Sequence, residues 1–185
     1  METLLKYSVG IDCGKKEIVA AMILVSLERG LRVKGTRKFR NTINGFNDCK
    51  LWILHHKKHD LPVTITMEAT GNYHENLAFY FHEEKYPVSI ILANKAKKYL
   101  QSLGLKSKND KIDAKGLAQM GAEQRLPLWK PFSKEIYDLR MLTRYYEQLS
   151  NNLTIFMNQL ASIQAGKYKI EEVINCLKRQ IATID

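Results

Sequence analysis

Four acidic residues stand at positions from which their side chains could share one site. Asp12 lies where an apolar segment meets a turn, and Glu68 directly follows another apolar segment. A carboxylate at the C-terminal end of a strand points into the crevice where α/β sheets bind ligands. Asp110 and Asp113 are three residues apart where a helix is predicted to begin, so both project from one helix face. We call these four residues the acidic tetrad.

Carboxylates that meet in one place need a cation between them. If the strands that carry Asp12 and Glu68 are neighbours, and the helix that carries Asp110 and Asp113 crosses them, the tetrad converges. Four unpaired anions would then repel one another by several kcal/mol. Oxygen ligands without His or Cys favour Mg²⁺ or Mn²⁺ over zinc. Two such ions about 3.5–4 Å apart can clamp the attacking and leaving oxygens of a phosphoryl transfer. The tetrad is therefore predicted to bind metal and to be catalytic.

Each acid also has a simpler interpretation when it is taken alone. Asp12 suits a tight turn, and Glu68 suits a solvated loop. Asp110 and Asp113 complement the positive N-terminus of a helix, with the surrounding lysines facing water. Only their convergence would decide between these interpretations and a shared metal site.

The charge of the chain points to a polyanionic partner. Its 185 residues carry a formal net charge of +10, and the sequence pI is about 9.5. A strong positive excess favours nucleic acid. The excess is concentrated between residues 93 and 115, where seven lysines face two aspartates. We expect these lysines to hold a DNA backbone: Lys95, Lys97, Lys98, Lys106, Lys108, Lys111 and Lys115.

Hydrophobic periodicity predicts an α/β fold. Residues 5–25 indicate two strands joined by a turn at 12–16, and a third strand is predicted over 31–39. Asn44 is then predicted to cap a helix that runs to residue 56. Further along the chain, strands and helices alternate: strands at 61–67 and 88–92, helices at 73–85, 94–103 and 109–124. Three successive strands followed by alternating units predict a mixed sheet with helices on both faces.

The second part of the chain is predicted to be a coiled-coil helix. A proline-bounded segment, 127–132, is interpreted as a linker after a first domain at 1–126. Ser133 should cap a helix that runs to residue 165, and 166–185 would begin a truncated further region. Apolar residues alternate in steps of three and four along the helix, which favours pairing with a partner helix into a homodimer or larger homo-oligomer. This heptad stripe comprises Leu139, Leu142, Tyr146, Leu149, Leu153, Phe156, Leu160 and Ile163. The alternative is that the stripe folds back onto the chain's own first domain.

Composition favours a cytoplasmic globular protein. No apolar run approaches the roughly 20 residues that a membrane-spanning helix needs. The N-terminus carries an acid at position 2 and meets a polar turn after Ile11, unlike a signal peptide. Cys13, Cys49 and Cys176 form an odd set without C-x-x-C spacing, which predicts free thiols in a reducing compartment.

Three ordered motifs resemble one family. V-G-I-D-C-G-K, M-E-A-T-G-N-Y and K-S-K-N-D-K-I-D-A-K-G-L-A together cover about residues 7–120. They resemble the N-terminal domain of the DEDD transposases of the insertion-sequence 110 family, which includes DNA invertases and recombinases guided by a bridge RNA. The resemblance implies a ribonuclease H-like (RuvC-like) fold, with Asp12, Glu68, Asp110 and Asp113 at the family's four acidic positions. It also implies that the long helix matches the family's coiled-coil connector.

Two departures from the family pattern affect what we expect. Asn94-Lys95 stands where the family commonly has Asn-Pro. Family members continue into a second domain with a nucleophilic serine, and nothing after Lys167 resembles it. We therefore expect a truncated product or an expression fragment that cannot complete strand exchange alone. The need for a structured guide RNA stays open.

Other functions remain as alternatives. A stand-alone, structure-selective nuclease of RuvC type would need only this fold and tetrad. A sugar kinase or actin-like ATPase would need a second D-x-G hairpin, and this sequence contains one D-x-G. A non-catalytic module for nucleic-acid binding and dimerisation would bind nucleic acid equally well without the four acids.

Overall fold

The computed structural model describes residues 2–69, 71–104 and 109–184. The chain divides into two compact units, Met1–Lys130 and Pro131–Asp185. The first unit holds a five-stranded sheet whose strands are β1 (Leu4–Cys13), β2 (Glu17–Ser26), β3 (Gly30–Arg40), β4 (Val63–Ala69) and β5 (Val88–Leu92). Their order across the sheet is β3-β2-β1-β4-β5.

Strand direction makes the sheet mixed. The chain meanders through β1, β2 and β3 in antiparallel pairs, and β4 and β5 then join the other side of β1 in parallel. Parallel neighbours need a crossover, which helices supply in this unit. The predictions that the first and fourth strands are neighbours and that the sheet is mixed are confirmed.

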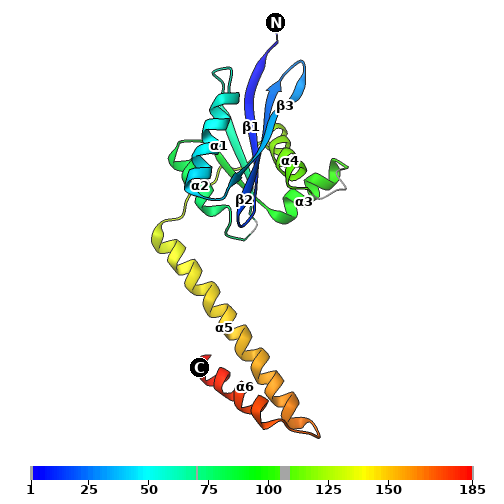
Figure 1. Ribbon diagram of the computed structural model, residues 1–185, viewed down its shortest axis with the longest axis vertical. Helices are drawn as coiled ribbons and strands as arrows, with labels where there is room; N and C mark the ends of the chain where they lie inside the picture. The colour runs from blue at the N-terminus through cyan, green and yellow to red at the C-terminus, as the bar shows by residue number, and fades with distance from the viewer. Residues whose placement is uncertain (1, 70, 105–108, 185) are drawn as a thin grey trace. The chain divides into compact units, whose positions relative to one another are not determined.

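Helices cover both faces of the sheet, as predicted (Figure 1). The helices of the first unit are α1 (Ile43–His56), α2 (Glu75–Glu83), α3 (Ala93–Ser102) and α4 (Asp110–Glu123). On one face, α1 and α2 bury a large core against β1 that includes Val9, Ile11 and Phe81. On the other face, α4 packs against β2 through Ala114 and Ala118. Alternate residues of β1 therefore face α1 and α2 on one side of the sheet and α4 on the other.

Some element boundaries differ from the prediction. Thr42 rather than Asn44 caps the first helix, which begins at Ile43: Thr42 takes an extended backbone, and its hydroxyl accepts a hydrogen bond from the Gly45 N–H. Strand β4 extends to Ala69, so Glu68 lies inside the strand rather than after it. Asn109 is the cap of α4 and not its first residue, since its side chain accepts a hydrogen bond from the Lys111 N–H.

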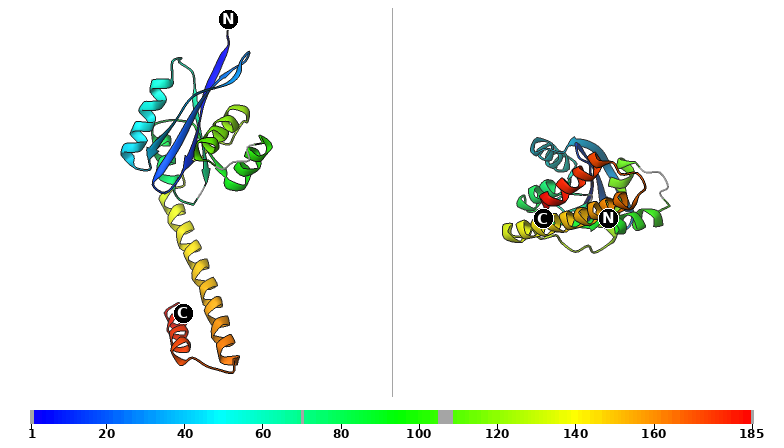
Figure 2. Two further views of the ribbon diagram at one scale, coloured as in Figure 1. Left: turned by 45° about the vertical axis from the view of Figure 1, so that its right-hand side comes forward. Right: turned by 90° about the horizontal axis from the view of Figure 1, so that it is seen from below.

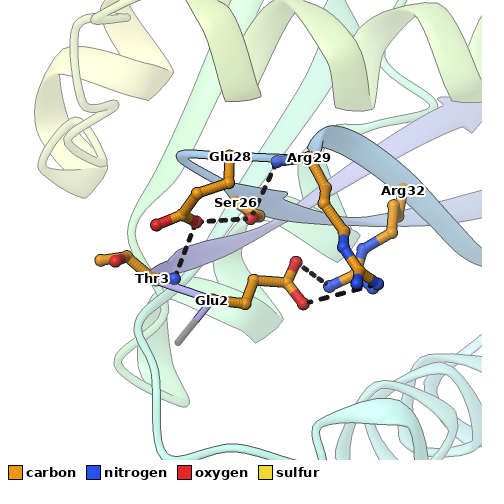
Figure 3. Close-up of polar contacts among 6 residues, drawn as sticks. All are labelled: Glu2, Thr3, Ser26, Glu28, Arg29 and Arg32. Atoms are coloured by element: carbon orange, nitrogen blue, oxygen red, sulfur yellow. Dashed lines mark hydrogen bonds and ion pairs between the residues drawn. The ribbon is translucent and has the colours of Figure 1, made fainter.

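Polar contacts connect the start of β1 to the turn between β2 and β3 and to the beginning of β3 (Figure 3). The backbone N–H of Thr3 donates to Glu28 at 2.8 Å, which ties the start of β1 to the β2–β3 turn. The Glu2 carboxylate faces the neighbouring guanidinium groups of Arg29 and Arg32 and forms an ion pair with each. These contacts lie at the end of the three strands opposite to Asp12.

The second unit consists of two helices, α5 (Lys134–Ala165) and α6 (Glu171–Ile184) (Figure 2). Ser133 caps α5, as predicted, by accepting a hydrogen bond from the Ile136 N–H. α6 packs against α5, and its residues Ile174 and Leu177 are buried. The heptad stripe is half-buried from Leu149 onward and exposed before it. Its pairing with a second chain therefore stays a prediction.

The segment 127–132, which we interpret as a linker, contacts the first unit at Trp129. The Trp129 N–H donates to the Val88 carbonyl at 2.8 Å, and its ring packs edge-on against Phe79. The change from one unit to the next falls after Lys130. Among the described residues, no helix is long and apolar enough to cross a membrane.

Helix α4 and strand β1 are so close at Gly10 that no side chain fits between their backbones. A Cβ added at Gly10 would lie 2.1 Å from the Ala118 nitrogen and 2.2 Å from the Ala114 oxygen. The Ser8 hydroxyl donates to the Ala118 carbonyl at 2.7 Å. At the next turn of α4, a Cβ added at Gly121 would lie 2.3 Å from the Thr66 hydroxyl. Small residues on both elements thus fix where α4 crosses the sheet.

Replacing Gly10 by Ala should displace α4, because the new methyl group would overlap helix backbone that cannot rotate away. We expect the free energy of unfolding to fall by about 2–3 kcal/mol, at the upper end of the usual cost of overpacking. Urea denaturation followed by circular dichroism measures this change. Gly14→Ala is the matched control, because its nearest contact, the Glu17 oxygen at 3.1 Å, needs to give only slightly. Equal stability of the two variants would contradict the close approach.

Candidate metal and phosphodiester site

The contact at Gly10 positions the first turn of α4 over the end of β1. Ser8 and Gly10 both face α4, so strand alternation directs Asp12 to the same face. The helix runs from Gly121 near Ser8 to Ala114 above Gly10. One further turn toward the helix N-terminus reaches Asp110 and Asp113, beyond Gly10 in the direction of Asp12.

Glu68 reaches the same face from β4. Parallel pairing sets Gly10 beside Thr66 and Ile11 beside Met67, so Glu68 continues the row beside Asp12. Thr66 lies against Gly121 of α4, which shows that this alternate set of β4 side chains faces α4. The fold therefore brings the four members of the acidic tetrad to one end of the sheet, under the N-terminus of α4.

The electrostatics of Asp12 reflect this convergence. Burial raises the pKa of Asp12 to about 6, and the charges of Asp110, Asp113 and Glu68 add to the increase. A hydrogen bond from the Cys13 N–H opposes it. Each of the other three acids thus acts on Asp12. A bound cation would reverse this penalty, because it favours the ionised carboxylate.

The start of α4 favours charge on its own two acids. Asn109 caps the helix, with the Lys111 N–H donating to its side chain at 2.9 Å. Asp110 and Asp113 lie in the first turn, where the partial positive charge of the helix N-terminus stabilises anions. Their simpler interpretation as helix-end charges is therefore compatible with the fold, but it leaves Asp12 and Glu68 unexplained.

The donor chemistry of the tetrad fits a hard divalent cation, since every candidate ligand is a carboxylate oxygen. As the side chains stand, the described residues contain no group of three or more His, Cys, Asp or Glu residues arranged to hold a metal ion. The backbone brings the acids together, and the side chains would have to close around an ion.

The neighbouring Cys13 does not compete for this role. Its side chain is 3% exposed, and burial raises the pKa of the thiol above its ordinary value, so it remains protonated at neutral pH. A protonated thiol is neither a nucleophile nor a metal ligand. Cys13, Cys49 and Cys176 are all free, as predicted.

The lysines predicted to hold DNA are exposed where the structure describes them. Lys95, Lys97 and Lys98 lie on α3, and Lys111 and Lys115 lie on α4. None of these five forms an ion pair with another described residue. Lys106 and Lys108 lie outside the described residues.

Sequence reasoning missed a residue that joins the two loops beside the tetrad. The Asn41 amide donates to the Gly14 carbonyl at 2.8 Å and to the Tyr73 carbonyl at 3.0 Å. Gly14 follows the strand of Asp12, and Tyr73 follows the strand of Glu68. Both amide hydrogens are used, so Asn41 holds the two acid-bearing strand ends together. Its position after β3 offered no signal, because the pairing depends on the fold.

Residues 9–166 match the family model of the insertion-sequence 110 DEDD transposases, whose description is "Transposase". The chain belongs to this transposase family. It is 32% identical over 148 residues to the pilin gene-inverting proteins of Moraxella bovis and Moraxella lacunata. The match covers 80% of this chain and 44% of each relative, so the chain spans less than half of their length.

Among solved structures, this transposase-family chain is similar to Thermus thermophilus RuvC. The two share 13% sequence identity with a TM-score of 0.47, over 66% of this chain and 99% of RuvC.

Replacing Asp12 by Asn should stabilise the metal-free protein. The pKa of Asp12 is about 3.8 in the unfolded chain and about 6 in the folded chain. Ionisation of Asp12 therefore does not affect folding stability below pH 3.8, and it lowers stability by its full amount above pH 6. Because the carboxylate is partly solvated, we expect a gain of about 1 kcal/mol at neutral pH, and none near pH 4. Urea denaturation with EDTA at both values measures it, with the exposed Asp48→Asn as the control. A pH-independent effect of Asp12→Asn would contradict the shift.

Proposed function

We propose that this chain is the metal-binding, DNA-processing part of a transposase or site-specific recombinase. Asp12, Glu68, Asp110 and Asp113 would hold Mg²⁺ or Mn²⁺ and act on a DNA phosphodiester. The observation that carries the proposal is geometric: Asp12 and Glu68 lie on adjacent parallel strands, and α4, whose first turn holds Asp110 and Asp113, crosses the same face of the sheet. The effect of the other three acids on the pKa of Asp12 supports it. Membership of the transposase family supports DNA as the substrate, and the name of the gene-inverting relatives points to rearrangement of DNA segments.

The residues divide the work by their place in the fold. With a divalent cation bound, the site would have a Lewis acid to polarise a phosphodiester. Asp12 and Glu68 sit on adjacent parallel strands and would form the rigid side of the metal site. Asp110 and Asp113 lie on a helix turn and would complete it from above.

DNA would be held by side chains that do not enter the metal site. Lys95, Lys97 and Lys98 on α3, with Lys111 and Lys115 on α4, would bind phosphates by charge alone. Lysine suits this role, because an ammonium is a compact point charge on a flexible stem. Such contacts position the substrate without reading its sequence.

Metal binding tests the proposal directly. Mn²⁺ titrated into the chain in a calorimeter should give a binding isotherm that Asp12→Asn and Asp113→Asn each abolish, because each variant removes a ligand. Asp48→Asn, an exposed acid on α1, should bind as the unmodified chain does. Unaltered Mn²⁺ binding in both tetrad variants would contradict the proposal. Cleavage of a four-way junction by this chain alone would favour the structure-selective nuclease instead.

We further propose that the exposed part of the heptad stripe joins two chains. Leu139, Leu142 and Tyr146 are 61%, 67% and 71% exposed, and α5 has no buried residue. Apolar positions spaced in this way pair with a second helix in a coiled coil.

Charge placed on the stripe should prevent this pairing. We expect the chain to sediment as a dimer, and Leu142→Glu to shift it toward monomer while the helical circular dichroism signal persists. Met141→Glu, an exposed apolar residue adjacent to Leu142 but outside the stripe, is the control and should stay dimeric. A chain that is monomeric before any substitution would rule out the dimer.

A further inference from the structure

One row of residues crosses the sheet at the level of Asp12. Asp12 pairs with Val19 of β2, and Val19 pairs with Lys38 of β3. Residues directly opposite in adjacent strands project to the same face. Val19 packs in the cluster of Ala114 and Ala118, so this face is the one that α4 covers. Lys38 therefore faces the same side as Asp12, two strands away, or about 10 Å.

Lys38 is held at this position by a second residue of the same face. Its ammonium lies 2.7 Å from a carboxylate oxygen of Glu17, a diagonal neighbour on β2. The two side chains are 49% and 53% exposed. An ion pair this open to water contributes little to folding stability. The pair can therefore open at small cost when another anion arrives.

The charge of the acidic tetrad reaches Lys38. A hydrogen bond and the charge of Glu17 raise the pKa of Lys38, and the charge of Asp110 adds to the increase. Lys38 thus remains cationic and lies within electrostatic range of the first turn of α4. Lys38 is not itself a member of the tetrad.

Lys38 also lies on the side of the sheet opposite to the three predicted DNA-binding lysines of α3. Helix α3, with its three lysines, packs near β4 and β5. Strand β3 is at the opposite edge of the sheet. A DNA strand that crosses the tetrad from the α3 side would need a cation on the β3 side, and Lys38 is on the tetrad face there.

We propose that Lys38 is a DNA-positioning residue, which exchanges Glu17 for a backbone phosphate of the DNA strand that lies across the acidic tetrad. Glu17 serves as the resting partner that keeps the lysine extended over this face. The inference rests on the proposed function, because it needs DNA at the tetrad. No bond is made or broken in the exchange: one ion pair replaces another.

The pair offers variants with opposite expected effects. Lys38→Gln should weaken binding of a labelled four-way junction. It should also make the negative slope of log K against log salt shallower by about 0.9, which is the contribution of one phosphate contact. Glu17→Gln should tighten binding, because it removes the competitor for Lys38. Ca²⁺ replaces Mg²⁺ in these titrations of the 185-residue chain, so that no strand is cut. Thermal unfolding of each variant shows that the fold is kept.

A second ion pair supplies the matched control. Lys50 and Glu84 are 2.8 Å apart on α1 and just after α2, on the opposite face of the sheet. Lys50→Gln and Glu84→Gln should leave both the affinity and the salt slope unchanged.

The outcomes separate this inference from the proposed function. An unchanged salt slope in Lys38→Gln, or weaker binding in Glu17→Gln, would overturn the role of Lys38 while DNA binding by the chain stands. Failure of the unmodified chain to bind the junction would overturn both. A shallower salt dependence of binding in Lys38→Gln, together with tighter binding in Glu17→Gln, supports the exchange. A purely structural pair would lose affinity in both variants.

Discussion

The backbone contact between Gly10 and α4 is the constraint on which the rest of the site depends. No side chain fits between the strand and the Ala114–Ala118 turn, so the helix crosses β1 at one fixed height. That height puts the first turn of α4 beyond Gly10, toward Asp12. A residue without a side chain thus decides where two carboxylates of the tetrad lie, although it can take no part in chemistry itself.

The same arrangement makes the site costly to the metal-free chain. Asp12 is partly buried and lies within range of three other acids, and both effects raise its pKa. The helix N-terminus offsets part of it for Asp110 and Asp113, and the Asn41 amide keeps the ends of the two acid-bearing strands together. Functional sites typically lower the stability of the protein that carries them in this way.

Much of the first unit could be predicted from sequence, because the relevant signals are local. Strand alternation, the turn after Asp12 and the basic segment around α3 and α4 all act within a few residues. Helix starts were less predictable: Thr42 rather than Asn44 caps α1, since either side chain could do so and the backbone decides. Other features join residues far apart in the chain, so only the three-dimensional fold reveals them. These are the close approach of Gly10 to Ala118, the two hydrogen bonds of Asn41 and the row from Asp12 to Lys38. The periodicity of α5 likewise predicted a stripe but could not show that α6 packs on the same helix.

The central claim is that the acidic tetrad closes around divalent ions. A crystal structure of the chain grown with Mn²⁺, with anomalous scattering measured at the manganese edge, tests it most directly. The account predicts manganese peaks between the Asp12 and Glu68 carboxylates, with oxygens of Asp110 or Asp113 completing the coordination. Manganese bound elsewhere, or a tetrad whose carboxylates stay apart at saturating Mn²⁺, would contradict it.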